Sequence, residues 1–202
     1  ASMEPTILSG DRILAAKIAY KFVVPFTHLT LFKTGTLERG DLIIFRYPKN
    51  PKIRFVKRVI GLPGDKIQLK NNTIFINSKP QKRTPFKQNH SALDNTHINK
   101  NLFTVFQEHL GTVTHWTMNI MPSQQELSKR NWPKNGQPVI VPINSVYVIG
   151  DNRDQSLDSR FFGEVPLSYI EGKALFVLWS LYTDPDIILP KFRINRFGKS
   201  LH

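Results

Sequence analysis

A serine close to the start of the chain is the first residue whose type could support chemistry. Ser2 opens the run Ser-Met-Glu-Pro-Thr, in which the proline restricts the backbone. A serine hydroxyl becomes an effective nucleophile when a neighbouring base takes its proton. Most serines are structural, so this run alone does not distinguish the two roles.

A lysine inside an apolar strand pattern could supply that base. Residues 55–60 read Phe-Val-Lys-Arg-Val-Ile, and on a strand of period two both faces of this run carry apolar side chains. We therefore expect Lys57 or Arg58 to be partly desolvated. Burial lowers the pKa of a lysine because it penalises the ammonium, and a neutral amine can accept the proton of a serine. The alternative is a lysine whose stem lies along the sheet while its amine reaches water.

The third cluster is a polar loop that directly follows an apolar strand pattern. Residues 150–163 read Gly-Asp-Asn-Arg-Asp-Gln-Ser-Leu-Asp-Ser-Arg-Phe-Phe-Gly. The simplest interpretation is a loop held together by Asp–Arg pairs and by turn-forming Asn and Ser side chains. Acid catalysis by the pair Asp151 and Asp154 is an alternative, but no matching histidine or metal-ligand spacing supports it.

The elements around these clusters are short apolar runs separated by Gly and Pro, which favours strands. The pair Asn71-Asn72 predicts a hairpin turn. One short helix is possible at 123–131. The pattern predicts an all-β, mostly antiparallel protein. Strands are expected at 41–47, 53–60, 66–70, 73–77, 139–141, 146–149 and 173–182.

The middle of the chain differs from its two ends. Residues 78–137 are polar, lack long apolar runs and contain four of the six histidines, which are His90, His97, His109 and His115. We interpret this stretch as part of an insertion. The expected organisation is a core domain formed by 1–65 and 143–202, with an inserted domain at 66–142.

Composition limits the possible partners and chemistry. Lys and Arg total 28 against 15 Asp and Glu, a net charge of +13, which favours anionic partners. The absence of cysteine excludes disulfides, thiol catalysis and cysteine metal sites. No apolar run reaches the roughly 18 residues of a spanning helix. The Ala-Ser-Met start is unlike a natural one, so we expect that an upstream segment has been removed.

Taken together, the three clusters resemble the motifs of the type I signal peptidases, also called leader peptidases. Smaller motifs support this: Gly10-Asp11, Arg39-Gly40-Asp41, Tyr47-Pro48 and Gly163-x-Val165-Pro166. The resemblance covers 1–69 and about 138–202. It implies a β-rich catalytic core domain with a smaller inserted β-rich domain. The implied enzyme is a serine endopeptidase with a dyad of Ser2 and Lys57, without metal or cofactor and with the histidines as bystanders. The implied activity is removal of signal peptides from exported preproteins after an Ala-x-Ala-like sequence.

The resemblance also implies roles for residues around the dyad. Ser156 would orient the lysine amine, Asp158 and Arg160 would form a structural ion pair, Asp151 would be a nearby structural carboxylate, and Arg58 matches the family's arginine beside the lysine. The residues implied to line the pockets for the −1 and −3 side chains of the substrate are Met3, Ile7, Ile44, Phe55 and Val56.

The implied location is the bacterial inner (cytoplasmic) membrane, with an anchor upstream of this chain and the catalytic part on the periplasmic side. The expected partners are preproteins and an anionic lipid surface, but no nucleic acid. An apolar group at 179–189 and nearby cations could contact lipid, although 174–182 could equally be an ordinary core strand. The residues proposed for this contact are Trp179, Leu181, Tyr182, Ile187, Ile188, Leu189, Lys191, Arg193, Arg196 and Lys199.

Three other interpretations compete with this one. Self-cleaving repressors also pair Ser and Lys, but the sequence shows neither their DNA-binding domain nor an internal cleavage site. A conjugation-pilus maturase of the same superfamily is harder to distinguish. A basic β-rich chain could also be an OB-like nucleic-acid binder, which the runs Phe45-Arg46-Tyr47 and Arg54-Phe55 suggest only weakly.

Overall fold

The fold consists mainly of antiparallel strands. The computed structural model describes residues 2–16, 22–23, 30–32, 36–86, 103–120, 137–182 and 191–201. Within these ranges the helical elements are α2 (Ser159–Phe162) and the 3-10 turns η4 (Leu167–Tyr169) and η5 (Ile194–Arg196). All strand pairs in the described chain are antiparallel. The predicted all-β, mostly antiparallel class is therefore confirmed.

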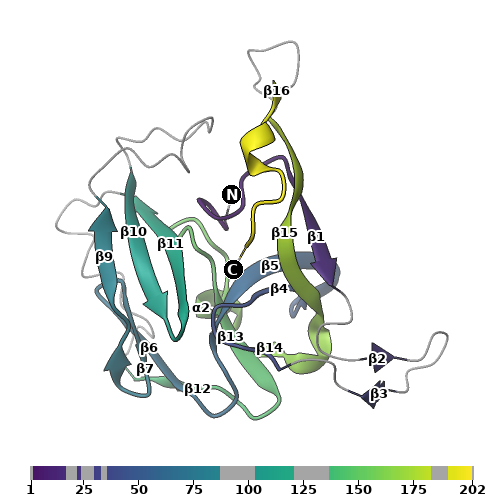
Figure 1. The fold of residues 1–202 in the computed structure, drawn as a ribbon. Helices are drawn as coiled ribbons and strands as arrows, with labels where there is room; N and C mark the ends of the chain where they lie inside the picture. The colour runs from purple at the N-terminus through teal and green to yellow at the C-terminus, as the bar shows by residue number, and fades with distance from the viewer. Residues whose placement is uncertain are drawn as a thin grey trace.

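A seven-stranded sheet forms the largest layer (Figure 1). Its strand order is β1-β15-β4-β5-β13-β14, with β16 also paired to β15. The strands predicted from the apolar runs at 41–47, 53–60, 146–149 and 173–182 all lie in this sheet. Its members are β1 (Asp11–Ala16), β4 (Leu42–Tyr47), β5 (Asn50–Gly61), β13 (Ser145–Ile149), β14 (Val165–Pro166), β15 (Ile170–Tyr182) and β16 (Lys191–Phe192).

A four-stranded sheet of order β12-β6-β7-β8 follows the long strand β5 in the chain. It contains the predicted hairpin, because Asn71 and Asn72 have φ values of 48° and 63°, the positive-φ pair that a tight two-residue turn requires. The strands are β6 (Lys66–Lys70), β7 (Thr73–Ile76), β8 (Lys79–Pro80) and β12 (Val139–Ile140).

A three-stranded sheet lies within the polar stretch that lacked long apolar runs. Its order is β11-β10-β9, formed by β9 (Arg83–Phe86), β10 (Phe103–Leu110) and β11 (Val113–Ile120). Polar side chains such as Glu108 and His115 are buried in it, which explains why hydrophobic alternation did not reveal it. A separate pair, β2 (Phe22–Val23) and β3 (Thr30–Phe32), forms a small ribbon. The helix predicted at 123–131 lies outside the described residues.

Hydrophobic packing joins the sheets and holds the N-terminal segment. One core cluster combines Ile60 and Ile149 of the large sheet with Ile67, Ile74 and other residues of the middle segment. The domain division at 66 and 142 stays a prediction, and this cluster spans it. A second cluster packs Met3 and Ile7 with residues of β4 and β15: Leu42, Ala174 and Val177. The first residues of the chain are therefore anchored against the large sheet.

Of the helical elements in the described ranges, none combines the length and the apolar character that crossing a bilayer requires.

Candidate active site

Ser2 and Lys57 come together although 55 positions separate them in the chain. Lys57 Nζ lies 2.6 Å from Ser2 Oγ and 3.0 Å from the Val56 carbonyl oxygen. Lys57 projects from β5 and is only 3% exposed. Two features position the serine: Met3 packs into the core beside it, and its carbonyl accepts a hydrogen bond of 3.1 Å from the Asn152 N–H.

Burial lowers the pKa of Lys57 to about 8, and the nearby charge of Arg160 adds slightly to this effect. The carboxylates of Asp158 and Asp151 act in the opposite direction but are outweighed. No described carboxylate forms an ion pair with this amine. About a tenth of this lysine is therefore neutral at pH 7, and the neutral amine is the state that can accept a proton from Ser2.

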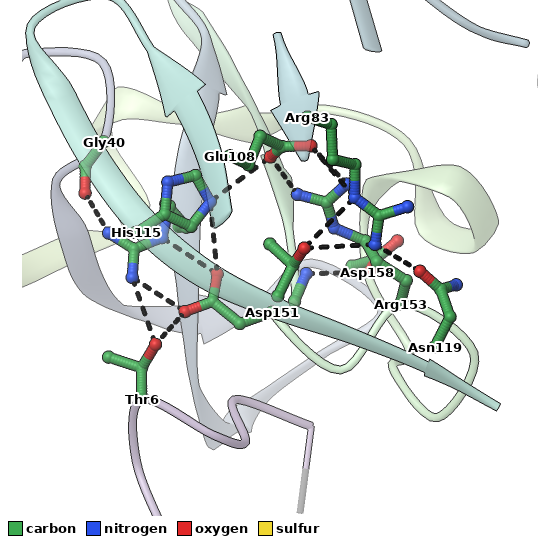
Figure 2. Close-up of polar contacts among 12 residues, drawn as sticks. Thr6, Gly40, Arg83, Glu108, His115, Asn119, Asp151, Arg153 and Asp158 are labelled. Atoms are coloured by element: carbon green, nitrogen blue, oxygen red, sulfur yellow. Dashed lines mark hydrogen bonds and ion pairs between the residues drawn. The ribbon is translucent and has the colours of Figure 1, made fainter. Parts of the chain in front are cut away.

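Arg58, next in the strand, points into a buried ion pair with Asp151. Its Nε and Nη2 atoms donate to the two carboxylate oxygens at 2.8 and 2.7 Å, and Nη1 donates to the Gly40 carbonyl at 2.7 Å. Thr6 adds a hydrogen bond of 2.5 Å from its hydroxyl to Asp151 (Figure 2). Burial alone would raise the pKa of Asp151, but the Arg58 guanidinium holds it below its ordinary value. Asp151 thus connects β5 with the segment that carries Ser2.

The loop after β13 is closed by a second ion pair. Arg160 Nε and Nη2 donate to Asp158 at 2.8 Å, and Asp158 also accepts the Gly150 N–H at 3.0 Å. Arg160 further donates to the Arg153 carbonyl at 2.6 Å. Ser156 Oγ is buried and makes no hydrogen bond within the described chain. Its role in orienting the lysine amine stays a prediction.

Asp154, the second carboxylate of the alternative acid pair, has other hydrogen-bond partners than Asp151. Its carboxylate accepts hydrogen bonds from Asn119 Nδ2 at 3.0 Å and from the Ile120 N–H at 2.7 Å. The two carboxylates therefore bind separate partners, and this arrangement gives no support to paired acid catalysis.

A pocket of about 460 Å³ opens beside the serine and the lysine. Four of the five predicted substrate-contacting residues line it, namely Met3, Ile7, Phe55 and Val56, whereas Ile44 is not part of the lining. Ile44 is instead paired with Val56 across β4 and β5. The sequence did not point to three further lining residues, which are Arg54, Gln155 and Leu157.

Sequence reasoning missed a group of buried polar residues behind the loop (Figure 2). Glu108 and Arg153 form an ion pair, and His115 lies 3.3 Å from Glu108 and 3.8 Å from Asp151. His115 is thus part of this buried group, and the expectation that the histidines are bystanders in the chemistry stays a prediction. His109 lies on the same hairpin and contacts Thr114 instead. His90 and His97 lie outside the described residues.

Two of the cations predicted to attract lipid are occupied inside the molecule. Arg196 is 4% exposed and pairs with Asp11 at 2.5 Å, and Arg193 is 6% exposed and donates to the Ser9 carbonyl. Burial and internal partners keep both guanidinium groups from the surface, so neither supports the predicted contact with anionic headgroups, which stays a prediction. The apolar residues at 187–189 lie outside the described residues.

The aromatic residues that suggested nucleic-acid binding form a packed group. The Tyr47 and Phe55 rings stack at 4.7 Å, and Phe45 and Phe162 pack against Phe55 at 6.3 Å. Phe45 is fully buried. These rings stabilise the end of β4 and β5 instead of forming a row of stacking platforms.

An all-β chain with a serine hydroxyl against a buried lysine amine, at the wall of a pocket, has the features of a serine peptidase. The family model for "Signal peptidase, peptidase S26" matches residues 1–179. The chain belongs to this signal peptidase family.

Relatives named signal peptidase I agree with this assignment. One from Buchnera aphidicola subsp. Schizaphis graminum is 35% identical over 98% of this chain and 71% of its own length. One from Pseudomonas aeruginosa is 32% identical over 95% of this chain and 66% of its own length. The chain thus spans about two thirds of the length of such curated relatives.

A crystal structure of a signal peptidase I from Enterococcus faecalis V583 is 28% identical and covers 68% of this chain and 96% of that one. Its TM-score is 0.39, so the family assignment rests on the sequence matches.

Proposed function

We propose that this chain cleaves N-terminal signal peptides from exported preproteins, with Ser2 as nucleophile and Lys57 as general base. The observation that carries the proposal is the 2.6 Å approach of the Lys57 amine to the Ser2 hydroxyl. The low pKa of that buried amine and the names of the relatives support it.

In the proposed mechanism, neutral Lys57 takes the hydroxyl proton of Ser2 while the serine oxygen attacks the carbonyl of the −1 residue. The Ser2 N–H stabilises the resulting oxyanion. Lys57, now charged, gives its proton to the departing amine of the mature protein. Water activated by the same lysine then hydrolyses the acyl-enzyme and frees the signal peptide.

The pocket supports a preference for small side chains on the substrate. Met3, Ile7, Phe55 and Val56 give it a largely apolar wall beside the reacting pair. Such a surface gains from burying a methyl group and rejects a larger side chain by overlap. We therefore propose cleavage after an Ala-x-Ala-like sequence. Ile44 does not line the pocket, so its proposed role in substrate binding requires substrate contacts outside the pocket lining.

Two substitutions test the proposal directly. Ser2→Ala removes the nucleophile, and Lys57→Met keeps a side chain of similar length without the amine. Each should abolish cleavage of a preprotein with an Ala-x-Ala site, measured as product at a single bond by gel and mass spectrometry. Lys66→Met, at an exposed lysine in β6, is the control and should cleave normally. Near wild-type turnover by Lys57→Met would show that the dyad is wrong.

We further propose that the enzyme works at the periplasmic face of the bacterial inner membrane and contacts lipid directly. Exposed apolar side chains near the C-terminus support the lipid contact: Phe192, Ile194 and Phe197 are 70%, 83% and 71% exposed. Trp179 on β15 is 47% exposed. Apolar and aromatic groups of this kind are stabilised at the headgroup boundary of a bilayer.

A further inference from the structure

The three-stranded sheet β9–β11 reaches the nucleophile through a continuous series of backbone hydrogen bonds. The Met118 N–H on β11 donates to the Asp151 carbonyl, and the Arg153 N–H donates back to the Met118 carbonyl, both at 2.9 Å. Between them, the Asn152 N–H donates to the Ser2 carbonyl at 3.1 Å. The loop segment 151–153 is therefore held by β11 on one side and holds Ser2 on the other.

Side chains reinforce this connection (Figure 2). Glu108 on β10 is directly opposite His115 on β11, and both point toward the loop. Arg153 Nη1 donates to Glu108 at 3.0 Å. His115 Nε2 lies 3.3 Å from Glu108 Oε2 and 3.8 Å from Asp151 Oδ1. The imidazole thus lies between two carboxylates, one paired with Arg153 and the other with Arg58.

Burial makes this group sensitive to the loss of any member. Glu108 is fully buried, and His115 and Arg153 are 5% and 3% exposed. Burial lowers the pKa of His115, and the Arg58 charge lowers it further against the opposing carboxylates of Glu108 and Asp151. The imidazole is therefore neutral at the pH where Lys57 loses its proton. Removing Glu108 leaves the buried charge of Arg153 uncompensated, and removing the neutral imidazole of His115 leaves a gap between two carboxylates, so either loss should weaken the contacts that hold the loop.

We propose that the β9–β11 sheet is part of the machinery that holds Ser2 against Lys57, with Glu108 and His115 as positioning residues. They act through the loop 151–153, whose Asp151 side chain fixes Arg58 on β5 and whose Asn152 N–H holds Ser2. This inference rests on the proposed function, because it assigns the sheet a part in the same reaction.

The experiment compares His115→Gln and Glu108→Gln with the control His109→Gln. His109 is on the same strand as Glu108 but on its opposite face, where it contacts Thr114. For cleavage of an Ala-x-Ala preprotein, we expect His115→Gln and Glu108→Gln to lower kcat about 10- to 100-fold with little change in KM, because a displacement of about 1 Å in the reacting pair has an effect of this size. His109→Gln should behave as wild type.

The second measurement reports the surroundings of the lysine without any substrate. The protein is labelled with ¹³C at the lysine Cε, and the Lys57 signal, identified by its loss in Lys57→Met, is titrated by NMR. Because burial is the main cause of the low pKa of Lys57, loosening the loop should raise that pKa toward its ordinary value in the two variants only. A purely structural role would lower the melting temperature without moving the pKa or kcat.

Folding is checked by circular dichroism and thermal unfolding above the assay temperature. Should either buried variant fail to fold, Asp154→Ala tests the same link, since Asp154 holds Asn119 and Ile120 of β11. Asp154→Ala should lower kcat and raise the pKa of Lys57, as expected for the two buried variants. Asp154→Asn, which keeps an acceptor oxygen, should recover most of the activity.

The inference is overturned if folded variants of Glu108, His115 or Asp154 keep the wild-type kcat and the wild-type Lys57 titration. A failure of the proposed function is a different result. In that case the wild-type protein does not cleave the preprotein, and the titration still shows whether the sheet controls the surroundings of the lysine.

Discussion

Two adjacent basic residues on β5 show why burial has different consequences for different side chains. The sequence predicted that Lys57 or Arg58 would be desolvated, and both are, at 3% and 1% exposure. Arg58 remains charged because Asp151 pairs with it through two hydrogen bonds. Lys57 has only hydroxyl and carbonyl neighbours within hydrogen-bond distance. Lowering its pKa from 10.5 to about 8 corresponds to roughly 3 kcal/mol of unfavourable burial of the charged form.

The first prediction at this scale concerns the pH dependence of cleavage. Only the neutral amine can accept the serine proton, so kcat/KM should rise with pH through about 8 and should fall about tenfold for each pH unit below that. The measurement is kcat/KM for a preprotein between about pH 5.5 and 9.5, with folding monitored at each pH. An optimum below about pH 6 would contradict a neutral amine base.

At the scale of elements, how well the sequence predicted the structure depended on how each strand is buried. β5, β6, β7 and β13 follow apolar patterns and appear where they were predicted. The strands β10 and β11 were not predicted, because their inward residues include Glu108, His115 and Asn119, and polar residues of this kind are normally expected to face solvent. Glu108 and Asn119 are buried because Arg83 and Arg153, from distant segments of the chain, pair with them. Partners so far away in the chain leave no local pattern.

The loop that holds Ser2 depends on a glycine, and this gives a prediction at the scale of elements. A Cβ at Gly150 would lie 2.2 Å from Ser156 Oγ and 2.5 Å from the Ser2 carbonyl oxygen. Gly150→Ala must therefore push the loop away from the nucleophile. We expect a loss of kcat on the order of 100-fold, measured on the folded variant. Gly64→Ala meets nothing within 4 Å but has a φ of 85°, so it should lower stability without changing turnover. Equal activity in the two variants would mean that the loop does not position Ser2.

At the scale of the whole molecule, internal ion pairs leave the net charge of +13 unchanged, because each takes up one cation and one anion, but they decide which arginines can face a partner. Arg58, Arg153 and Arg196 are buried against Asp151, Glu108 and Asp11. The sequence shows how many charged residues there are but not which of them pair inside the molecule, since each arginine lies 45 or more positions from its partner. Because Arg193 and Arg196 are buried against internal partners, contact with a membrane should depend on exposed apolar groups more than on these two arginines.

The exposed apolar residues near the C-terminus predict how the protein binds lipid. Phe192, Ile194 and Phe197 are largely exposed and lie on β16, which pairs with the end of β15 (Figure 1), or within five residues after it in the chain. Changing all three to Ser should remove most binding to liposomes in a flotation assay, and this loss should appear with zwitterionic as well as anionic lipid, because burial of apolar area is the main attraction. Changing Ile140 and Ile143 to Ser removes apolar side chains that are 68% and 76% exposed elsewhere and should leave binding intact. If the wild-type protein floats only with anionic lipid, and 0.5 M salt (roughly a 4 Å Debye length) abolishes this, charge and not the apolar group carries the contact.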